Sequence, residues 1–128
     1  MAVEEALLVV PARSDLLSLL RAVVADLAAR QGFSYDAIDD LRIAVSEAAT
    51  FLLAAGSAAS RLELRITPTA GGLDVDLSTD ASTGVWPPPG ADRSLAWQVL
   101  SALTDQADLM GDGATPGLHL VKLSAPAG

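Results

Sequence analysis

The chain contains no cysteine and a single histidine, His119. Disulfides, thiol catalysis and cysteine-ligated zinc are therefore excluded, and one imidazole argues against a histidine-based metal site or triad. Long hydrophobic runs are also lacking. The longest uncharged stretch, between Glu47 and Arg61, contains Thr, Gly and Ser and is shorter than the ~17–25 apolar residues of a spanning helix. The start, Met1–Glu5, lacks the basic residues of a secretory signal. We expect a cytoplasmic protein without a membrane span.

Positive charge is scarce. Lys and Arg number 8 against 16 Asp and Glu, so the net charge is −8 and the pI is near 4.3. Such a chain is repelled by nucleic acid and attracted to basic surfaces. An acidic protein that sequesters a DNA-binding factor fits this balance, and no nucleic-acid partner is expected. On charge alone, acidity that only serves solubility is the simpler interpretation.

The length of 128 residues predicts one domain, residues 1–128, which buries roughly two-thirds of its unfolded surface. Hydropathy patterns and turn residues predict three helices and five strands. The helices are a first one capped by Ser14 or Asp15 and ending near Gly32, a second from Ser34 to about Gly56, and a third from Asp92 or Ser94 to Leu103; the strands are 6–10, 61–67, 73–78, 106–110 and 118–124. The order β-α-α-β-β-α-β-β indicates an α+β, two-layer sandwich with helices on one face of a sheet.

The predicted strands differ in how they expose apolar side chains. Segments 61–67 and 73–78 alternate strictly, and their charged sides suit a solvated face. Segment 6–10 is apolar on both sides, which an edge strand normally avoids. This strand is therefore either central in the sheet or covered by a second chain.

The second predicted helix carries the most informative pattern. Ser34 is a natural N-cap, and Asp36 lies in the first turn, where the helix dipole favours negative charge. Apolar residues then recur at three- and four-residue steps and form one face: Ile38, Leu41, Val45, Ala48 and Leu52. Glu47 lies within this run. Its carboxylate is therefore either exposed at the margin of the apolar face or positioned for a chemical role.

The run Leu41-Arg-Ile-Ala-Val-Ser-Glu-Ala-Ala-Thr50 resembles the N box of the GHKL (Bergerat-fold, histidine kinase-like) ATPases. The pattern is most similar to the anti-sigma factors that are also serine-protein kinases, the RsbW type, and among them the actinobacterial sigma-F anti-sigma factors. In that family the motif reads Ala-Val-x-Glu-x-x-Thr-Asn, where the Glu is the catalytic base and the Asn holds magnesium. The resemblance assigns the base to Glu47, whereas Phe51 stands at the Asn position. A phenyl ring cannot ligate a hard cation, so the resemblance implies an idle base and no metal site.

Two further motifs of the family are altered. The motif Asp-x-Gly-x-Gly, whose Asp reads the adenine amino group, corresponds to Asp80-Ala-Ser-Thr-Gly84, with Ser82 in place of the first Gly. The motif Gly-x-Gly-Phe, which holds phosphates at a helix N-terminus, corresponds to Ser94-Leu-Ala-Trp97. The resemblance therefore makes Asp80, Gly84 and Ser94 degenerate cofactor-binding positions.

The same residues have simpler interpretations. On pattern alone Asp80 is a turn or cap residue and Trp97 is a core aromatic. Trp86, which precedes three prolines, is either an exposed docking residue or a loop anchor. In the family a flexible lid precedes the Gly-x-Gly-Phe motif. Here the corresponding loop is short and proline-rich, which predicts a stiff loop that does not close over a ligand.

Losing magnesium and phosphate contacts together should cost on the order of a thousandfold or more in rate. We therefore expect an anti-sigma factor of stress-response type that sequesters an alternative sigma factor by protein–protein binding, with kinase and ATP-binding capacity weak or lost and no cofactor. The partners that the resemblance implies are the sigma factor, an anti-anti-sigma factor of the STAS type and a second copy in a homodimer. The resemblance also places Arg21 at the sigma-factor contact, and a solvated helix Arg is an equal interpretation of that residue.

Two alternatives remain. An active ATP-dependent serine kinase would phosphorylate an anti-anti-sigma factor with Glu47 as base and would bind Mg-ATP and Mg-ADP. A small-ligand sensor would use an ATP pocket refilled by apolar side chains around Phe51. Nucleotide binding distinguishes the kinase from the anti-sigma factor, and a co-purified ligand other than a nucleotide would favour the sensor.

Overall fold

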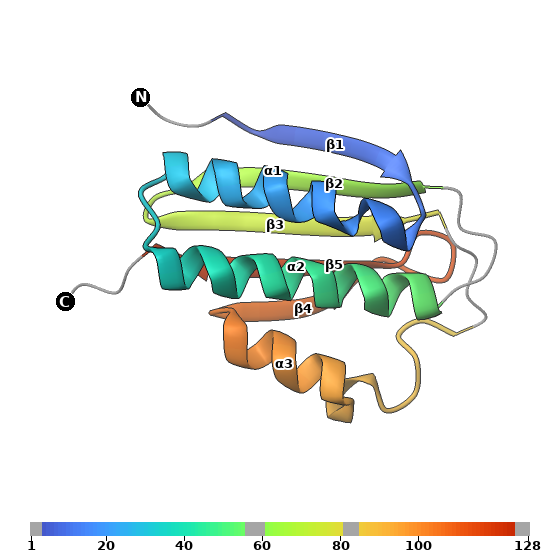
Figure 1. The fold of residues 1–128 in the computed structure, drawn as a ribbon. Helices are drawn as coiled ribbons and strands as arrows, with labels where there is room; N and C mark the ends of the chain where they lie inside the picture. Colours follow the sequence, from blue (N-terminus) through green and yellow to red (C-terminus); the bar gives the residue numbers. More distant parts are fainter. Residues whose placement is uncertain (1–3, 56–60, 81–84, 125–128) are drawn as a thin grey trace.

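The computed structural model describes residues 4–55, 61–80 and 85–124 (Figure 1). Their helices and strands follow in the order β1, α1, α2, β2, β3, α3, β4, β5, with a 3-10 turn before α1 and another before α3. The bounds are β1 Ala6–Pro11, α1 Leu17–Arg30, α2 Tyr35–Ala55, β2 Arg61–Thr69, β3 Gly72–Thr79, α3 Leu95–Leu103, β4 Gln106–Met110 and β5 Gly117–Leu123. The predicted order and the α+β class are confirmed.

The strands form an antiparallel sheet in the order β1-β2-β3-β5-β4. The helices α1, α2 and α3 lie on one face of this sheet (Figure 1). Alternate residues of the strands point into the helical layer and are at most 1% exposed; on β2, β3 and β5 they are Leu62, Leu64, Ile66, Leu73, Val75, Leu77, Leu118 and Leu120. The hydrophobic core therefore lies between the two predicted layers.

Helix α2 is the central helix of its layer, between α1 and α3 (Figure 1). Ser34 caps it as predicted, because its Oγ accepts the N–H of Ala37 at 3.2 Å. The buried face is rich in small residues, which let the helix approach the sheet closely: Ala37, Leu41, Ala44, Val45, Ala48, Ala49 and Leu52. No helix in the described ranges is both long enough and apolar enough to cross a membrane.

Helix α1 begins differently from the prediction. Its N-cap residue is Leu16, which makes no side-chain cap hydrogen bond, and a 3-10 turn over Ser14–Leu16 precedes it. Asp15 is bonded to Arg13 instead, at 2.6 Å between Nη2 and Oδ2. The prediction that Ser14 or Asp15 caps α1 was therefore wrong, because it considered only the helix and not the basic residue in front of it.

The sheet face without helices carries a row of charges, as predicted. Arg65 on β2 pairs with Glu5 and lies in register with Asp76 on β3. Asp76 in turn contacts His119 on β5, with 2.6 Å between Oδ1 and Nδ1. Basic and acidic side chains thus alternate from strand to strand across the solvated face.

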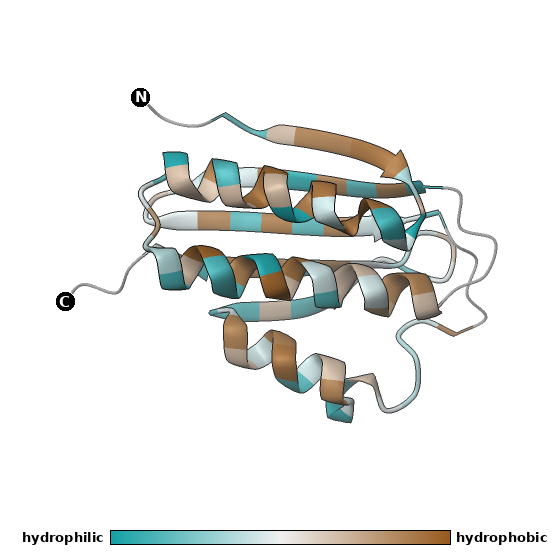
Figure 2. Ribbon diagram, viewed as in Figure 1, coloured by the Kyte–Doolittle hydropathy of each residue, from teal (hydrophilic) through white to brown (hydrophobic). Residues whose placement is uncertain are grey.

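Strand β1 is an edge strand, paired with β2 alone. The alternative that it is central in the sheet was wrong. Figure 2 shows it hydrophobic along nearly its whole length. On the sheet face without helices, Leu7 and Val9 of β1 are each 50% exposed. Cover by a second chain, the other predicted arrangement, stays a prediction.

Lys122, the single lysine of the chain, is enclosed between the sheet and the helices. Its side chain is 14% exposed, and its Nζ lies 3.3 Å from Oδ2 of Asp40 on α2. The same nitrogen donates to the carbonyl oxygen of Leu103, the last residue of α3, at 2.9 Å. One ammonium group therefore ties β5 to both neighbouring helices, at the C-terminus of α3 where a cation is favoured.

Candidate functional site

Two aromatic rings meet near the C-terminal end of α2. Phe51, on α2, contacts Trp86 edge to face, with 6.0 Å between ring centroids and 66° between ring planes. Both side chains are partly buried against the core. The indole Nε1 of Trp86 donates to the carbonyl oxygen of Met110, the last residue of β4, at 2.7 Å. We call Phe51, Trp86 and the Met110 carbonyl the aromatic closure.

Trp86 is a loop anchor, the second of its two predicted interpretations. Its neighbours Val85 and Pro87 are exposed, whereas its own side chain packs inward. Among the described residues 85–90, Trp86 alone forms a hydrogen bond to the sheet, whereas Pro88 and Gly90 accept N–H groups of the adjoining 3-10 turn, Ala91–Arg93. The three prolines that follow carry no N–H to donate, so one side chain holds this part of the loop on the body of the protein.

Glu47, the predicted base, lies one helical turn before Phe51. Its side chain is half-buried and makes no hydrogen bond or ion pair with the described residues. Thr50, which matches the family motif, is exposed. The carboxylate of Glu47 therefore has no partner among the described residues, and the side chain one turn further along α2 is a phenyl ring that offers no metal ligand.

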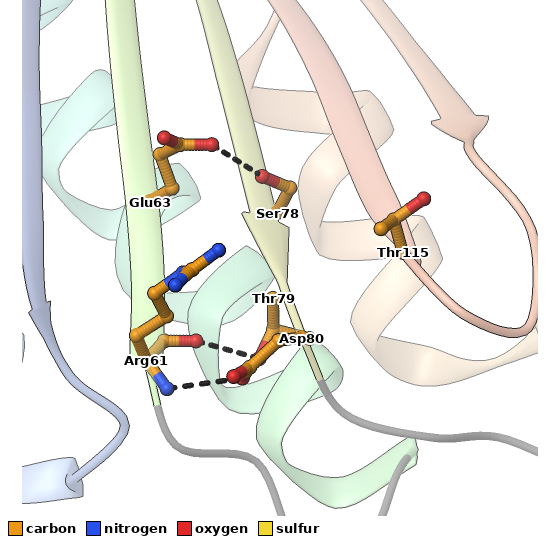
Figure 3. Close-up of a pocket in the computed structure, with 6 residues that line it drawn as sticks. All are labelled: Arg61, Glu63, Ser78, Thr79, Asp80 and Thr115. Atoms are coloured by element: carbon orange, nitrogen blue, oxygen red, sulfur yellow. Dashed lines mark hydrogen bonds between the residues drawn. The ribbon is translucent and has the colours of Figure 1, made fainter.

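Asp80, the predicted adenine reader, lies at the end of β3. One carboxylate oxygen accepts the backbone N–H of Arg61, the first residue of β2, at 3.0 Å. The neighbouring Thr79 donates its hydroxyl to the carbonyl oxygen of Arg61 at 2.8 Å. Figure 3 shows these bonds in a small pocket of about 60 Å³. Its described lining comes from β2, the end of β3 and the segment before β5, not from α2 or α3: Arg61, Glu63, Ser78, Thr79, Asp80 and Thr115.

Ser94, at the predicted phosphate position, is the N-cap of α3. Its Oγ accepts the N–H of Trp97 at 3.1 Å and donates to the carbonyl oxygen of Ala91 at 2.7 Å. Trp97 is partly buried against the core, which agrees with its interpretation as a core aromatic. The hydroxyl that replaces the family's first glycine therefore satisfies the start of the helix itself.

Arg21, the predicted partner-binding residue, lies on α1 and is half-buried. Its Nη1 donates to Oγ of Ser46 on α2 at 2.8 Å. Ser46 directly precedes Glu47, so the guanidinium group lies on the α1–α2 surface next to the N-box motif. Sequence reasoning missed Ser46, and the only signal for it was that two helices joined by a short turn run side by side.

The structure does not gather the predicted cofactor positions around one cavity. Asp80 is bonded to β2, Ser94 caps α3 and Phe51 is covered by Trp86. Gly84 and Ser82 lie outside the described residues. In the described part of the chain, no three His, Asp or Glu side chains are placed to hold a metal ion. Among the described residues, Phe51 offers no oxygen ligand at the position where the family holds magnesium.

Comparisons with known proteins place the chain among its relatives. A family model described as the histidine kinase-like ATPase domain matches residues 10–121. The anti-sigma-F factor RsbW of Mycobacterium tuberculosis is 34% identical over 107 residues, which cover 84% of this chain and 62% of that relative. The serine-protein kinase RsbW of Listeria monocytogenes is 55% identical over 40 residues, 31% of this chain and 26% of the relative. The chain thus spans less than two-thirds of the length of these relatives.

A solved structure supports the architecture. The crystal structure of the RsbU and RsbW domains of Rv1364c from Mycobacterium tuberculosis superposes with a TM-score of 0.75 at 18% sequence identity. The match covers 98% of this chain and 34% of that one. At this identity the match shows the fold, and it agrees with the predicted histidine kinase-like sandwich.

Proposed function

The chain belongs to the histidine kinase-like ATPase family, and from this premise we propose that it is an anti-sigma factor that sequesters an alternative sigma factor by protein–protein binding, with kinase and ATP-binding capacity weak or lost. The observation that carries the proposal is the aromatic closure. An indole packs on the phenyl ring that stands where the family has its metal ligand. A site that holds two aromatic rings in place of an amide and a magnesium ion favours binding to a protein over transfer of phosphate.

The charge of the chain supports a basic partner. A net charge of −8 attracts positively charged surfaces, which raises association rates and selects against acidic partners. The DNA-binding regions of a sigma factor are basic, and the relative from Mycobacterium tuberculosis carries the name of an anti-sigma-F factor. An anti-anti-sigma factor of the STAS type would compete for the same protein and release the sigma factor.

Two surfaces offer places for protein partners. Arg21 lies on the α1–α2 surface beside Ser46, and we propose it as a contact of the sigma factor. Strand β1 presents Leu7 and Val9 half-exposed on an unpaired edge, and we propose it as the homodimer contact. An edge strand with exposed apolar side chains is stabilised when a second chain covers it.

Nucleotide binding tests the proposal first. Thermal unfolding is measured with and without millimolar Mg-ATP, and the related Listeria RsbW serves as positive control. A ligand at a hundred times its dissociation constant adds about 2.7 kcal/mol and would move the midpoint by several degrees. We expect no shift. A clear shift would favour the serine kinase.

Partner binding tests the other half of the proposal. Each alternative sigma factor of the source organism is titrated into the protein by calorimetry. We expect a complex of at least submicromolar affinity with one of them. If none of them binds, the anti-sigma assignment is wrong.

The active serine kinase remains the second candidate, because Glu47 is half-buried and makes no bond that would occupy it among the described residues. Transfer of labelled phosphate from ATP to a serine of an anti-anti-sigma factor measures this directly. Glu47→Gln is the matched control, since it keeps the shape and removes the base. Transfer at ordinary kinase rates that disappears in Glu47→Gln would contradict loss of the activity.

A further inference from the structure

The side chain of Trp86 is held in the way a bound ligand is held. One edge contact with Phe51 orients its ring, and one hydrogen bond to the Met110 carbonyl fixes its N–H. The ring packs against the core while Val85, directly before it in the chain, is 64% exposed. The indole is thus the inserted part of a loop whose next residue on each side faces solvent.

The surface that receives the indole does not depend on the loop. Phe51 belongs to α2, which the sheet, α1 and α3 hold in place. Met110 ends β4, which is paired with β5 along its length. A ring face and a carbonyl acceptor are therefore fixed by regular structure, as a preformed binding site requires.

We propose that the space filled by Trp86, here named the indole site, is a binding site for flat heteroaromatic groups that carry an N–H donor, and that Trp86 occupies it from within the same chain. The ring of Phe51 selects for an aromatic partner, since edge-to-face contacts favour a second ring. The Met110 carbonyl selects for an N–H, because it accepts the indole N–H at 2.7 Å and a group without a donor loses this bond. The inference concerns a different ligand class from the proposed partner proteins and does not depend on the anti-sigma role.

Tethering explains why the wild-type site is filled by Trp86. A group that belongs to the same chain as its site has an effective concentration there of about millimolar. A free ligand of similar affinity must exceed that concentration before it displaces the indole. Removing the side chain removes this competition and leaves the site open.

The test uses Trp86→Ala and two probes of nearly equal size. Indole carries the N–H, and benzofuran has an oxygen in its place. At about five times its dissociation constant, indole should raise the unfolding midpoint of Trp86→Ala by roughly 3–5 °C for a chain of this size. Benzofuran should raise it clearly less, and wild type should respond to neither probe at the same concentration. If a folded Trp86→Ala does not respond to indole, the proposal is wrong.

Two controls separate the site from a general effect of cavities. Trp97→Ala removes the other tryptophan, whose side chain has no hydrogen-bond partner among the described residues, so indole and benzofuran should act alike on it. Trp86→Leu is a milder truncation and replaces Trp86→Ala if that variant does not fold. Equal responses of the Trp86 variant to both probes would overturn the assignment of the Met110 carbonyl as the selecting group.

Discussion

The aromatic closure covers its apolar side chains, whereas the β1 edge leaves its apolar side chains exposed. At the closure, Phe51 and Trp86 come from distant parts of the chain and cover one another. At the edge, Leu7 and Val9 are each 50% exposed, and no described part of the chain lies over them. Apolar surface that a chain covers itself contributes to folding, whereas apolar surface left open can contribute only to association. The difference is consistent with the proposal that the exposed surface of β1 is a contact for another protein chain.

The largest expected effect is on stability at the closure. Phe51→Ala removes the ring beneath Trp86, and we expect a loss of about 2–3 kcal/mol in unfolding free energy, less than for a fully buried ring. Leu7→Ala, the matched truncation at the edge, should cost below about 1 kcal/mol in the monomer, because half of that side chain already contacts water. Urea unfolding at low protein concentration measures both. Equal losses of unfolding free energy in the two variants would show that the closure and the edge do not differ in their contribution to folding.

The next effect is on self-association. A lysine at position 9 places a charge on the proposed contact, so Val9→Lys should weaken the homodimer about tenfold or more while the fold is retained. Sedimentation over a range of concentrations measures the dissociation constant. Leu123→Lys is the control, since Leu123 on β5 is also 50% exposed but lies outside β1. A wild type that sediments as a monomer at every concentration would contradict the proposal for β1.

Arg21 tests whether partner binding also uses the helical layer. Arg21→Glu should weaken the sigma-factor complex about tenfold, because it reverses a charge and breaks the bond to Ser46. Arg30→Glu is the matched control, since Arg30 lies on the same helix, exposed and paired with Asp26 at 2.7 Å. Calorimetric titration compares the two. Unchanged affinity in Arg21→Glu would remove this residue from the contact.

The smallest effect concerns pH at the turn that follows Met110. Backbone N–H groups of Ala114 and Thr115 donate to Asp112 at 2.8 and 3.0 Å and lower the pKa of its carboxyl group. A lowered folded-state pKa stabilises the protein above the unfolded value of about 3.9, and this stabilisation is lost as the pH falls through the folded pKa. Wild type should therefore lose slightly more stability than Asp112→Asn between about pH 5 and pH 2. Thermal unfolding across this range measures the difference, and parallel curves would mean that the turn makes no contribution.

Local patterns were sufficient to predict most of the fold. The caps Ser34 and Ser94 lie at helix starts as expected, because capping depends on residues two or three positions away. The edge position of β1 could not be derived. A central strand and an edge strand that another chain covers have the same apolar sequence pattern, so the pattern does not distinguish them. Strand order depends on contacts between distant segments, which periodicity does not report.

The candidate site was predicted less completely. The resemblance identified Phe51 as an altered position, but the partner of its ring lies 35 positions further along the chain, in a loop without periodicity. Asp80 could be placed at the end of a strand, yet its bond to the N–H of Arg61 depends on the register between β2 and β3. Hydrogen bonds of this range follow from the assembled sheet and leave no mark in local sequence.

The enclosure of Lys122 has a practical consequence for chemical labelling. It supplies the only side-chain amine of this sequence, and in the folded state that amine is bonded to Asp40 and to the end of α3. Amine-reactive reagents should therefore modify the side chain slowly, at a rate set by how often α3 and α2 separate from β5. Mass spectrometry can follow the rate of acylation at this one position. That rate therefore reports how often the helical layer opens, and no foreign residue has to be introduced.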